Sequence, residues 1–194
     1  MKPADEPYGA SFSREGTESG FSLLSRGDRV RGRLARPESP GTHPLILIAG
    51  PDGCARSDSV DGAMAAWTDW AVVAAIDLPL CGSRRSDKVS LSSLETGDSL
   101  VARLRGDLEI QVEADLERSF AFLRGALGDS PAAFFGSGLG AELALPFCRN
   151  ASGLDAVALA PLSPVEASLG DHVRIFAPRP TREEVAEFLR SRLL

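Results

Sequence analysis

Four stretches of the chain are apolar at nearly every position: residues 44–49, 71–76, 132–135 and 154–160. A short apolar run without polar alternation is typical of a strand that is buried on both faces of a parallel sheet. Residues 172–177 fit a last strand. Near the N-terminus, residues 21–24 and 30–35 flank the turn sequence Arg26-Gly27-Asp28 and predict a hairpin.

Helical periodicity separates these strands. Met64, Trp67 and Trp70 recur at three-residue steps and predict a helix over residues 59–70. A longer apolar stripe predicts a helix over residues 100–127, with its acidic residues, Asp115 among them, on the solvated side. The stripe consists of Leu100, Leu104, Leu108, Val112, Leu116, Phe120, Leu123 and Leu127. Thr181 and Glu184 form a capping box that opens a C-terminal helix.

The alternation of strands and helices predicts the α/β class, with a doubly wound, mostly parallel sheet and right-handed crossovers. Residues 1–20 carry prolines and glycines among scattered charges, and we expect them to form a flexible N-terminal tail. Residues 21–194 are expected to form a single domain, because no linker divides them.

A glycine-rich turn joins the strand at residues 132–135 to a following helix. This is the frame of the nucleophile elbow G-x-S-x-G of α/β-hydrolases, in which a sharp turn presents a serine. The residues two positions before and after the nucleophile must be small. Gly136 and Gly140 satisfy that requirement only with Gly138 at the centre, since centring on Ser137 puts a phenylalanine and a leucine at the flanks. The elbow therefore carries glycine in place of its nucleophile.

Three further motifs support the same fold. Residues 31–37 contain a G-x-L-x-x-P stretch, residues 50–53 stand where an H-G-x-G loop is expected, and residues 77–84 follow a D-x-P-x-H-G pattern with Cys81 replacing histidine. Together with the elbow, these motifs resemble small esterases and dienelactone-hydrolase-like proteins of the α/β-hydrolase superfamily over residues 28 to 162. The resemblance implies a compact member with a shortened C-terminal half.

The catalytic base of that family is also missing from its expected place. α/β-Hydrolases carry a histidine after the last strand. His43 and His172 are the two histidines of this sequence, and each precedes its predicted strand. Both are therefore expected at the edge of the sheet opposite the elbow, and Asp171, the acid beside His172, shares that location.

An active enzyme would need another nucleophile. The weak alternatives are Ser137, Cys81 and Cys54, acting through a water-mediated base in a small ester or lactone hydrolase. The cations nearest to the two cysteines in the sequence are arginines, which favour a thiolate but cannot shuttle protons.

Binding requires less than turnover does. The N–H groups of Leu139 and of the Asp52-Gly53-Cys54 loop are expected to converge at a helix N-terminus, where an oxyanion or carboxylate binds. We therefore predict a pseudoenzyme that binds a small anionic ligand or a partner protein, or that self-associates through a sheet edge left less covered by the short C-terminal half.

Composition narrows the function classes further. The 194 residues carry a net charge of −6 without a basic block, which disfavours nucleic-acid binding. The sequence has no apolar run of bilayer length, so we expect no membrane association. Three cysteines without C-x-x-C spacing fit a reducing, cytoplasmic compartment. We expect no metal, since the sequence offers no cluster of metal ligands, and no cofactor, since the glycine-rich turn lacks both the lysine of a phosphate-binding loop and the spacing of a dinucleotide site.

Overall fold

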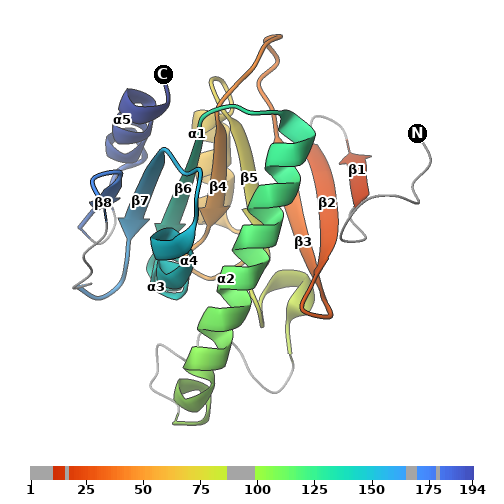
Figure 1. Ribbon diagram of the computed structural model, residues 1–194, viewed down its shortest axis with the longest axis vertical. Coiled ribbons are helices and arrows are strands. Elements are labelled where there is room, and N and C mark those ends of the chain that lie inside the picture. The colour runs from red at the N-terminus through yellow and green to blue at the C-terminus, as the bar shows by residue number, and fades with distance from the viewer. Residues whose placement is uncertain (1–10, 16–17, 87–98, 165–169, 178–179) are drawn as a thin grey trace.

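Figure 1 shows the computed structural model, which describes residues 11–15, 18–86, 99–164, 170–177 and 180–194. An eight-stranded sheet runs through this described part, in the order β1-β2-β3-β5-β4-β6-β7-β8. The pairs from β1 to β5 are antiparallel, and those from β5 to β8 are parallel. The strands are β1 (Ser11–Glu15), β2 (Glu18–Ser25), β3 (Asp28–Ala35), β4 (Leu45–Ala49), β5 (Val72–Ile76), β6 (Ala132–Ser137), β7 (Ala156–Ala160) and β8 (Val173–Ile175).

Helices cover both faces of this sheet. The long helix α2 crosses one face together with α3 and α4, and α1 and α5 cover the other face (Figure 1). The helices are α1 (Asp58–Trp67), η1 (Gly82–Arg84), α2 (Ser99–Leu127), α3 (Gly138–Leu143), α4 (Leu145–Asn150) and α5 (Arg182–Leu193). Leu45 and Leu47 of β4 belong to the core under α2, while Ile46 and Ile48 belong to the core under α1. This division confirms the predicted doubly wound, mostly parallel architecture, because alternate side chains of a strand point to opposite faces.

The predicted strands and hairpin are present. Every residue of β4, β5 and β7 is buried, as the continuous apolar runs predict. Arg26 and Gly27 link β2 to β3 with φ angles of 49° and 85°. Both angles are positive, which a two-residue type I′ hairpin turn requires.

The structure corrects the N-terminal boundary. Ser11–Glu15 forms β1 and pairs with β2, although the composition predicts a flexible tail up to residue 20. The Phe12 ring stacks on Phe122 of α2 with a centroid separation of 4.8 Å. Local composition cannot predict this contact, because the two rings lie far apart in the sequence. Residues 1–10 and 16–17, also within the predicted tail, lie outside the described residues.

The predicted solvent exposure of Asp115 on α2 is wrong. The helix spans the predicted residues, but Asp115 is fully buried rather than solvated. Its Oδ2 accepts a hydrogen bond from Nη1 of Arg84 at 2.5 Å, and its Oδ1 accepts one from Gln111 at 2.7 Å. A buried carboxylate needs such partners, and Arg84 reaches it from the loop after β5.

Candidate functional site

The predicted elbow is present at the end of β6. The strand continues to Ser137, which has an extended backbone, and α3 begins at the next residue. Gly138 has a φ of 54°. A side chain in this left-handed region costs free energy that glycine avoids, so the turn has the conformation of a nucleophile elbow with a bare α-carbon at its apex.

The flanking glycines are required by close packing. A Cβ on Gly136 would lie 2.8 Å from the Cα of Ala141, and one on Gly140 would lie 2.5 Å from the carbonyl oxygen of Ala49. Both distances are too short for a real side chain. Strand β6, helix α3 and the end of β4 therefore meet only because these two positions carry no side chain, as the centring on Gly138 predicts.

Pro51 covers the apex of the elbow. A Cβ on Gly138 would lie 2.8 Å from both the Cα and the Cβ of Pro51, and 3.1 Å from its carbonyl oxygen. The loop after β4 thus fills the space into which the side chain of a nucleophile would project. The apex of the elbow therefore carries no hydroxyl and has no space for a side chain.

A mostly apolar cavity of about 480 Å³ opens beside this apex. Its wall combines the loop after β4, helix α1, the ends of β6 and β7, and the start of α5. The lining residues are Pro51, Ser59, Ala63, Trp67, Phe135, Ser137, Gly138, Ala160, Pro161, Leu162, Pro180, Thr181, Arg182 and Val185. We call it the elbow cavity. The size lies within the range of small-molecule sites.

Two residues of the elbow-cavity wall carry a shielded polar atom. The Oγ of Ser137 and the Nε1 of Trp67 are closed off from solvent and have no hydrogen-bond partner among the described residues. Buried polar atoms are nearly always paired in folded proteins. Ser137, a weak alternative nucleophile in the sequence, is therefore in the cavity wall, beside the apex rather than at it.

The expected oxyanion-type loop is arranged differently. The N–H of Gly53 donates to the carbonyl of Gly50 at 3.1 Å, and the N–H of Cys54 donates to Oδ1 of Asp52 at 3.1 Å. Asp52, Gly53, Cys54 and Leu139 are not among the residues that line the elbow cavity. Both loop donors are satisfied within their own turn, and α3, which contains Leu139, is only six residues long.

Asp77 holds this loop in place. Its buried carboxylate accepts hydrogen bonds from the N–H of Ala55 at 2.9 Å and from the N–H and hydroxyl of Ser83 at 3.0 and 2.8 Å. Gly82, with a φ of 51°, lets the chain pass directly over the carboxylate. The loops after β4 and β5 are thereby joined, and each carries one of the candidate cysteines.

The two cysteines point at the same carbonyl oxygen. Cys81 donates to the carbonyl of Asp52 at 3.0 Å, and Cys54 approaches it at 3.7 Å. Burial raises the pKa of the Cys81 thiol, and burial likewise raises the pKa of the half-buried Cys54 thiol. A raised pKa disfavours the thiolate, which is the form of cysteine that attacks.

Both histidines lie where the sequence predicts. His43 precedes β4, and its Nε2 lies 2.9 Å from the carbonyl oxygen of Ser39. His172 precedes β8. Neither residue lines the elbow cavity, and the sequence holds no third histidine.

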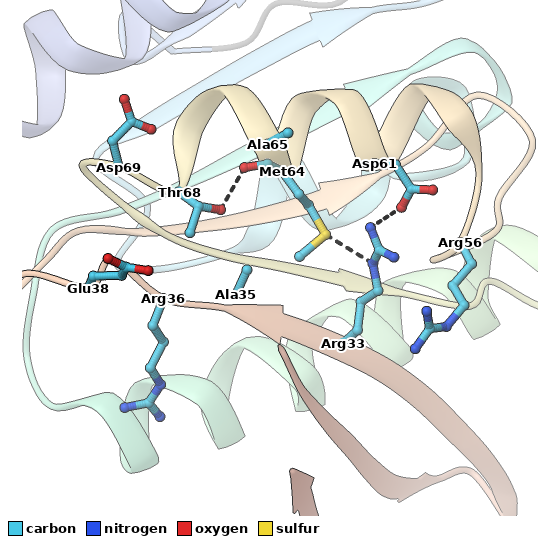
Figure 2. A pocket seen from close by; sticks show the side chains of 10 residues that line it. All are labelled: Arg33, Ala35, Arg36, Glu38, Arg56, Asp61, Met64, Ala65, Thr68 and Asp69. Carbon is cyan, nitrogen blue, oxygen red and sulfur yellow. Dashed lines mark hydrogen bonds and ion pairs between the residues drawn. The ribbon is translucent and has the colours of Figure 1, made fainter. Parts of the chain in front are cut away.

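A second pocket of about 590 Å³ lies between β3 and α1 (Figure 2). Its charged wall residues are Arg33, Arg36, Arg56, Glu38, Asp61 and Asp69. Arg33 forms an ion pair with Asp61, and its Nε donates to the sulfur of Met64 at 3.0 Å. The wall carries as many acids as arginines and shares no residue with the elbow cavity. We therefore take the elbow cavity as the candidate site.

Across the described residues, no cluster of three or more His, Cys, Asp or Glu side chains could hold a metal ion. Within the same residues, each helix is too short or too polar to cross a bilayer.

Comparisons with known proteins agree with the fold. No protein-family model and no curated protein match the sequence, but solved structures match the chain. A novel cold-adapted esterase from an Arctic intertidal metagenomic library is 19% identical with a TM-score of 0.62, and the match covers 79% of this chain and 65% of the esterase. The acetyl xylan esterase from Paenibacillus sp. R4 is 18% identical with a TM-score of 0.59, covering 80% of this chain and 54% of that one.

A highly thermostable carboxyl esterase from Bacillus coagulans matches at 15% identity with a TM-score of 0.55, covering 75% of this chain and 44% of that esterase. The chain thus spans less than two-thirds of the length of each of these enzymes. At such identities the likeness concerns the backbone alone. The elbow turn, the mostly parallel sheet and these structural neighbours together show that the chain has the α/β-hydrolase fold.

Proposed function

We propose that this chain is a non-hydrolytic binding module built on the α/β-hydrolase fold, with the elbow cavity as its ligand site. The observation that carries the proposal is the apex of the elbow, where Gly138 offers no nucleophile and Pro51 occupies the space above it. The four motifs that resemble small esterases and dienelactone-hydrolase-like proteins favour such an enzyme as the origin of the scaffold.

Ester hydrolysis needs groups that ligand binding does not need. An alcohol nucleophile needs a base that takes its proton, and a triad arranges both within hydrogen-bond reach. Here His43 and His172 lie outside the cavity wall. A cavity of this size and apolar character still binds a small molecule, because binding depends on shape and burial rather than on proton transfer.

The test is a panel of activated esters combined with covalent probes. We expect wild-type protein and Ser137→Ala to hydrolyse p-nitrophenyl acetate, p-nitrophenyl butyrate and dihydrocoumarin at the same background rate, with an active esterase as the positive control. A fluorophosphonate should leave Ser137 unlabelled. Iodoacetamide at pH 8 should modify Cys54 and Cys81 more slowly than it does in urea, because burial raises the pKa of both thiols.

The second candidate is a small ester or lactone hydrolase that uses Ser137 or a cysteine. Two observations favour it: the structural neighbours are esterases, and Ser137 is a lining residue of the cavity. Labelling at Ser137, Cys54 or Cys81 that rises and falls with turnover would establish this candidate and overturn the first.

We propose further that the β8 edge of the sheet mediates self-association or binds a partner protein. This strand has three residues, and Ile175 on it is 40% exposed. An unpaired, apolar strand edge is a template for pairing with another chain.

Light scattering tests this proposal. The wild-type protein should have a mass above that of one chain, and Ile175→Lys should return it to a monomer. Ile110→Lys, at an exposed position on α2, is the matched control. A monomeric wild-type protein that co-purifies with no other protein contradicts this proposal.

A further inference from the structure

We infer that the elbow cavity binds a small apolar carboxylate, with the carboxylate group held by the guanidinium of Arg182. The inference rests on the proposed ligand-binding function and adds the chemical class of the ligand and the residue that recognises it. Three features of the cavity carry it: the composition of its wall, its shielded hydrogen-bond donors and the surroundings of Arg182.

The apolar side chains of the wall determine which kind of group the ligand carries. Trp67 and Phe135 meet edge to face with a centroid separation of 5.2 Å, and both line the cavity. Prolines and aliphatic side chains complete most of the remaining surface: Pro51, Ala63, Ala160, Pro161, Leu162, Pro180 and Val185. Such a surface gains free energy by taking up an aromatic or branched aliphatic group from water.

Two residues of the wall carry a polar atom that lacks a hydrogen-bond partner among the described residues. An indole N–H can only donate a hydrogen bond, so Nε1 of Trp67 can be satisfied only by an acceptor. The Ser137 hydroxyl can donate as well. Neither group has a partner among the described residues. Both atoms are shielded from solvent, so a ligand oxygen satisfies them only where the wall side chain turns its polar atom toward the cavity.

Arg182 supplies the positive charge at the cavity. Its guanidinium packs directly against Gly62 of α1, where a Cβ would collide with its Nη1, Cζ and Nη2 atoms. The bare glycine therefore creates the seat of the guanidinium. Arg182 forms no ion pair with the described residues. The nearby Glu184 carboxylate is engaged by Thr181, whose N–H and hydroxyl donate to it at 2.8 and 3.0 Å.

The position of Arg182 in α5 is unfavourable for helix stability. It is the first helical residue, where the positive end of the helix dipole repels a cation. Arg182 is exposed at the rim of the cavity, and packing on Gly62 fixes its guanidinium there. Since a guanidinium matches a carboxylate with two parallel hydrogen bonds, an apolar cavity beside an unneutralised arginine fits an apolar acid.

Isothermal titration calorimetry with phenylacetate, 3-methylbutanoate and the neutral analogue phenylacetamide tests the inference. We expect wild-type protein to bind phenylacetate at least tenfold more tightly than phenylacetamide. Arg182→Gln should bind both equally, and Arg182→Lys should keep part of the preference because it retains the charge without the planar fork. The matched control is Arg190→Gln on the same helix. The Arg190 guanidinium lies 4.9 Å from the Trp70 ring, outside the elbow cavity, and its loss should leave the preference unchanged.

The outcomes separate the inference from the proposed function. Equal binding of acid and amide by wild-type protein, or a full preference kept by Arg182→Gln, overturns the carboxylate inference and leaves the cavity as a ligand site. Binding of neither acid nor amide counts against the ligand site itself. Loss of the preference in Arg182→Gln with the amide affinity retained supports both.

Discussion

Replacing Arg84 by methionine should lower the free energy of unfolding by about 3–5 kcal/mol, the cost of leaving one partner of a buried ion pair behind. Nη1 of Arg84 lies 2.5 Å from Oδ2 of Asp115, and the two side chains are 5% and 0% exposed. Arg84 also donates to Asp28 at 2.8 Å and to the carbonyl of Asp77 at 3.2 Å. The substitution leaves Asp115 as an uncompensated charge between α2 and the loop after β5.

Urea unfolding followed by tryptophan fluorescence measures this loss, and two variants identify its cause. Arg85→Met, at the exposed neighbouring position, should change stability by less than about 0.5 kcal/mol. The double variant Arg84→Met with Asp115→Leu should recover most of the stability, because it removes the stranded carboxylate as well. A single Arg84→Met variant as stable as wild type would mean that the pair contributes no net stability.

The same ion pair shows where sequence-based prediction fails. The apolar stripe of α2 predicts the helix correctly, but periodicity treats each charged residue as solvated and so places Asp115 outside. Asp115 can be buried because it pairs with Arg84, and this partner lies 31 positions earlier in the chain. A pairing over that distance leaves no trace in a local pattern of apolar and polar residues.

The elbow could be predicted because its rule is local. Gly136, Gly138 and Gly140 are spaced as the turn requires, and that spacing can be read from the sequence although the backbone that crowds Gly140 is that of Ala49 and Gly50 in another strand and its loop. The cover that Pro51 forms over Gly138 depends on the path of the loop after β4. The contribution of Arg182 to the cavity depends on where α5 packs against α1. The spacing of residues in the sequence predicts neither the position of Pro51 nor that of Arg182. The expected binding residues around Asp52 therefore differ from those that line the cavity.

Replacing Gly138 by serine should restore the nucleophile of the motif without restoring an enzyme, and it should lower the free energy of unfolding by about 2–5 kcal/mol. A non-glycine residue at a φ of 54° costs roughly 1–2 kcal/mol. The new Cβ would also lie 2.8 Å from Pro51, and overpacking of this kind costs about 1–3 kcal/mol. Chemical unfolding measures the loss, and p-nitrophenyl acetate hydrolysis should stay at background.

Two variants separate the parts of this effect. Gly153→Ser is the matched control, since Gly153 has a φ of 85° with nothing within 4 Å of the added Cβ, and it should show only the backbone cost. Combining Gly138→Ser with Pro51→Gly should recover part of the collision cost, because the Cβ of Pro51 is removed while its Cα remains. Even the relieved apex should not turn over ester, since the cavity wall contains neither His43 nor His172. Hydrolysis by either serine variant would mean that an imidazole reaches the elbow in solution.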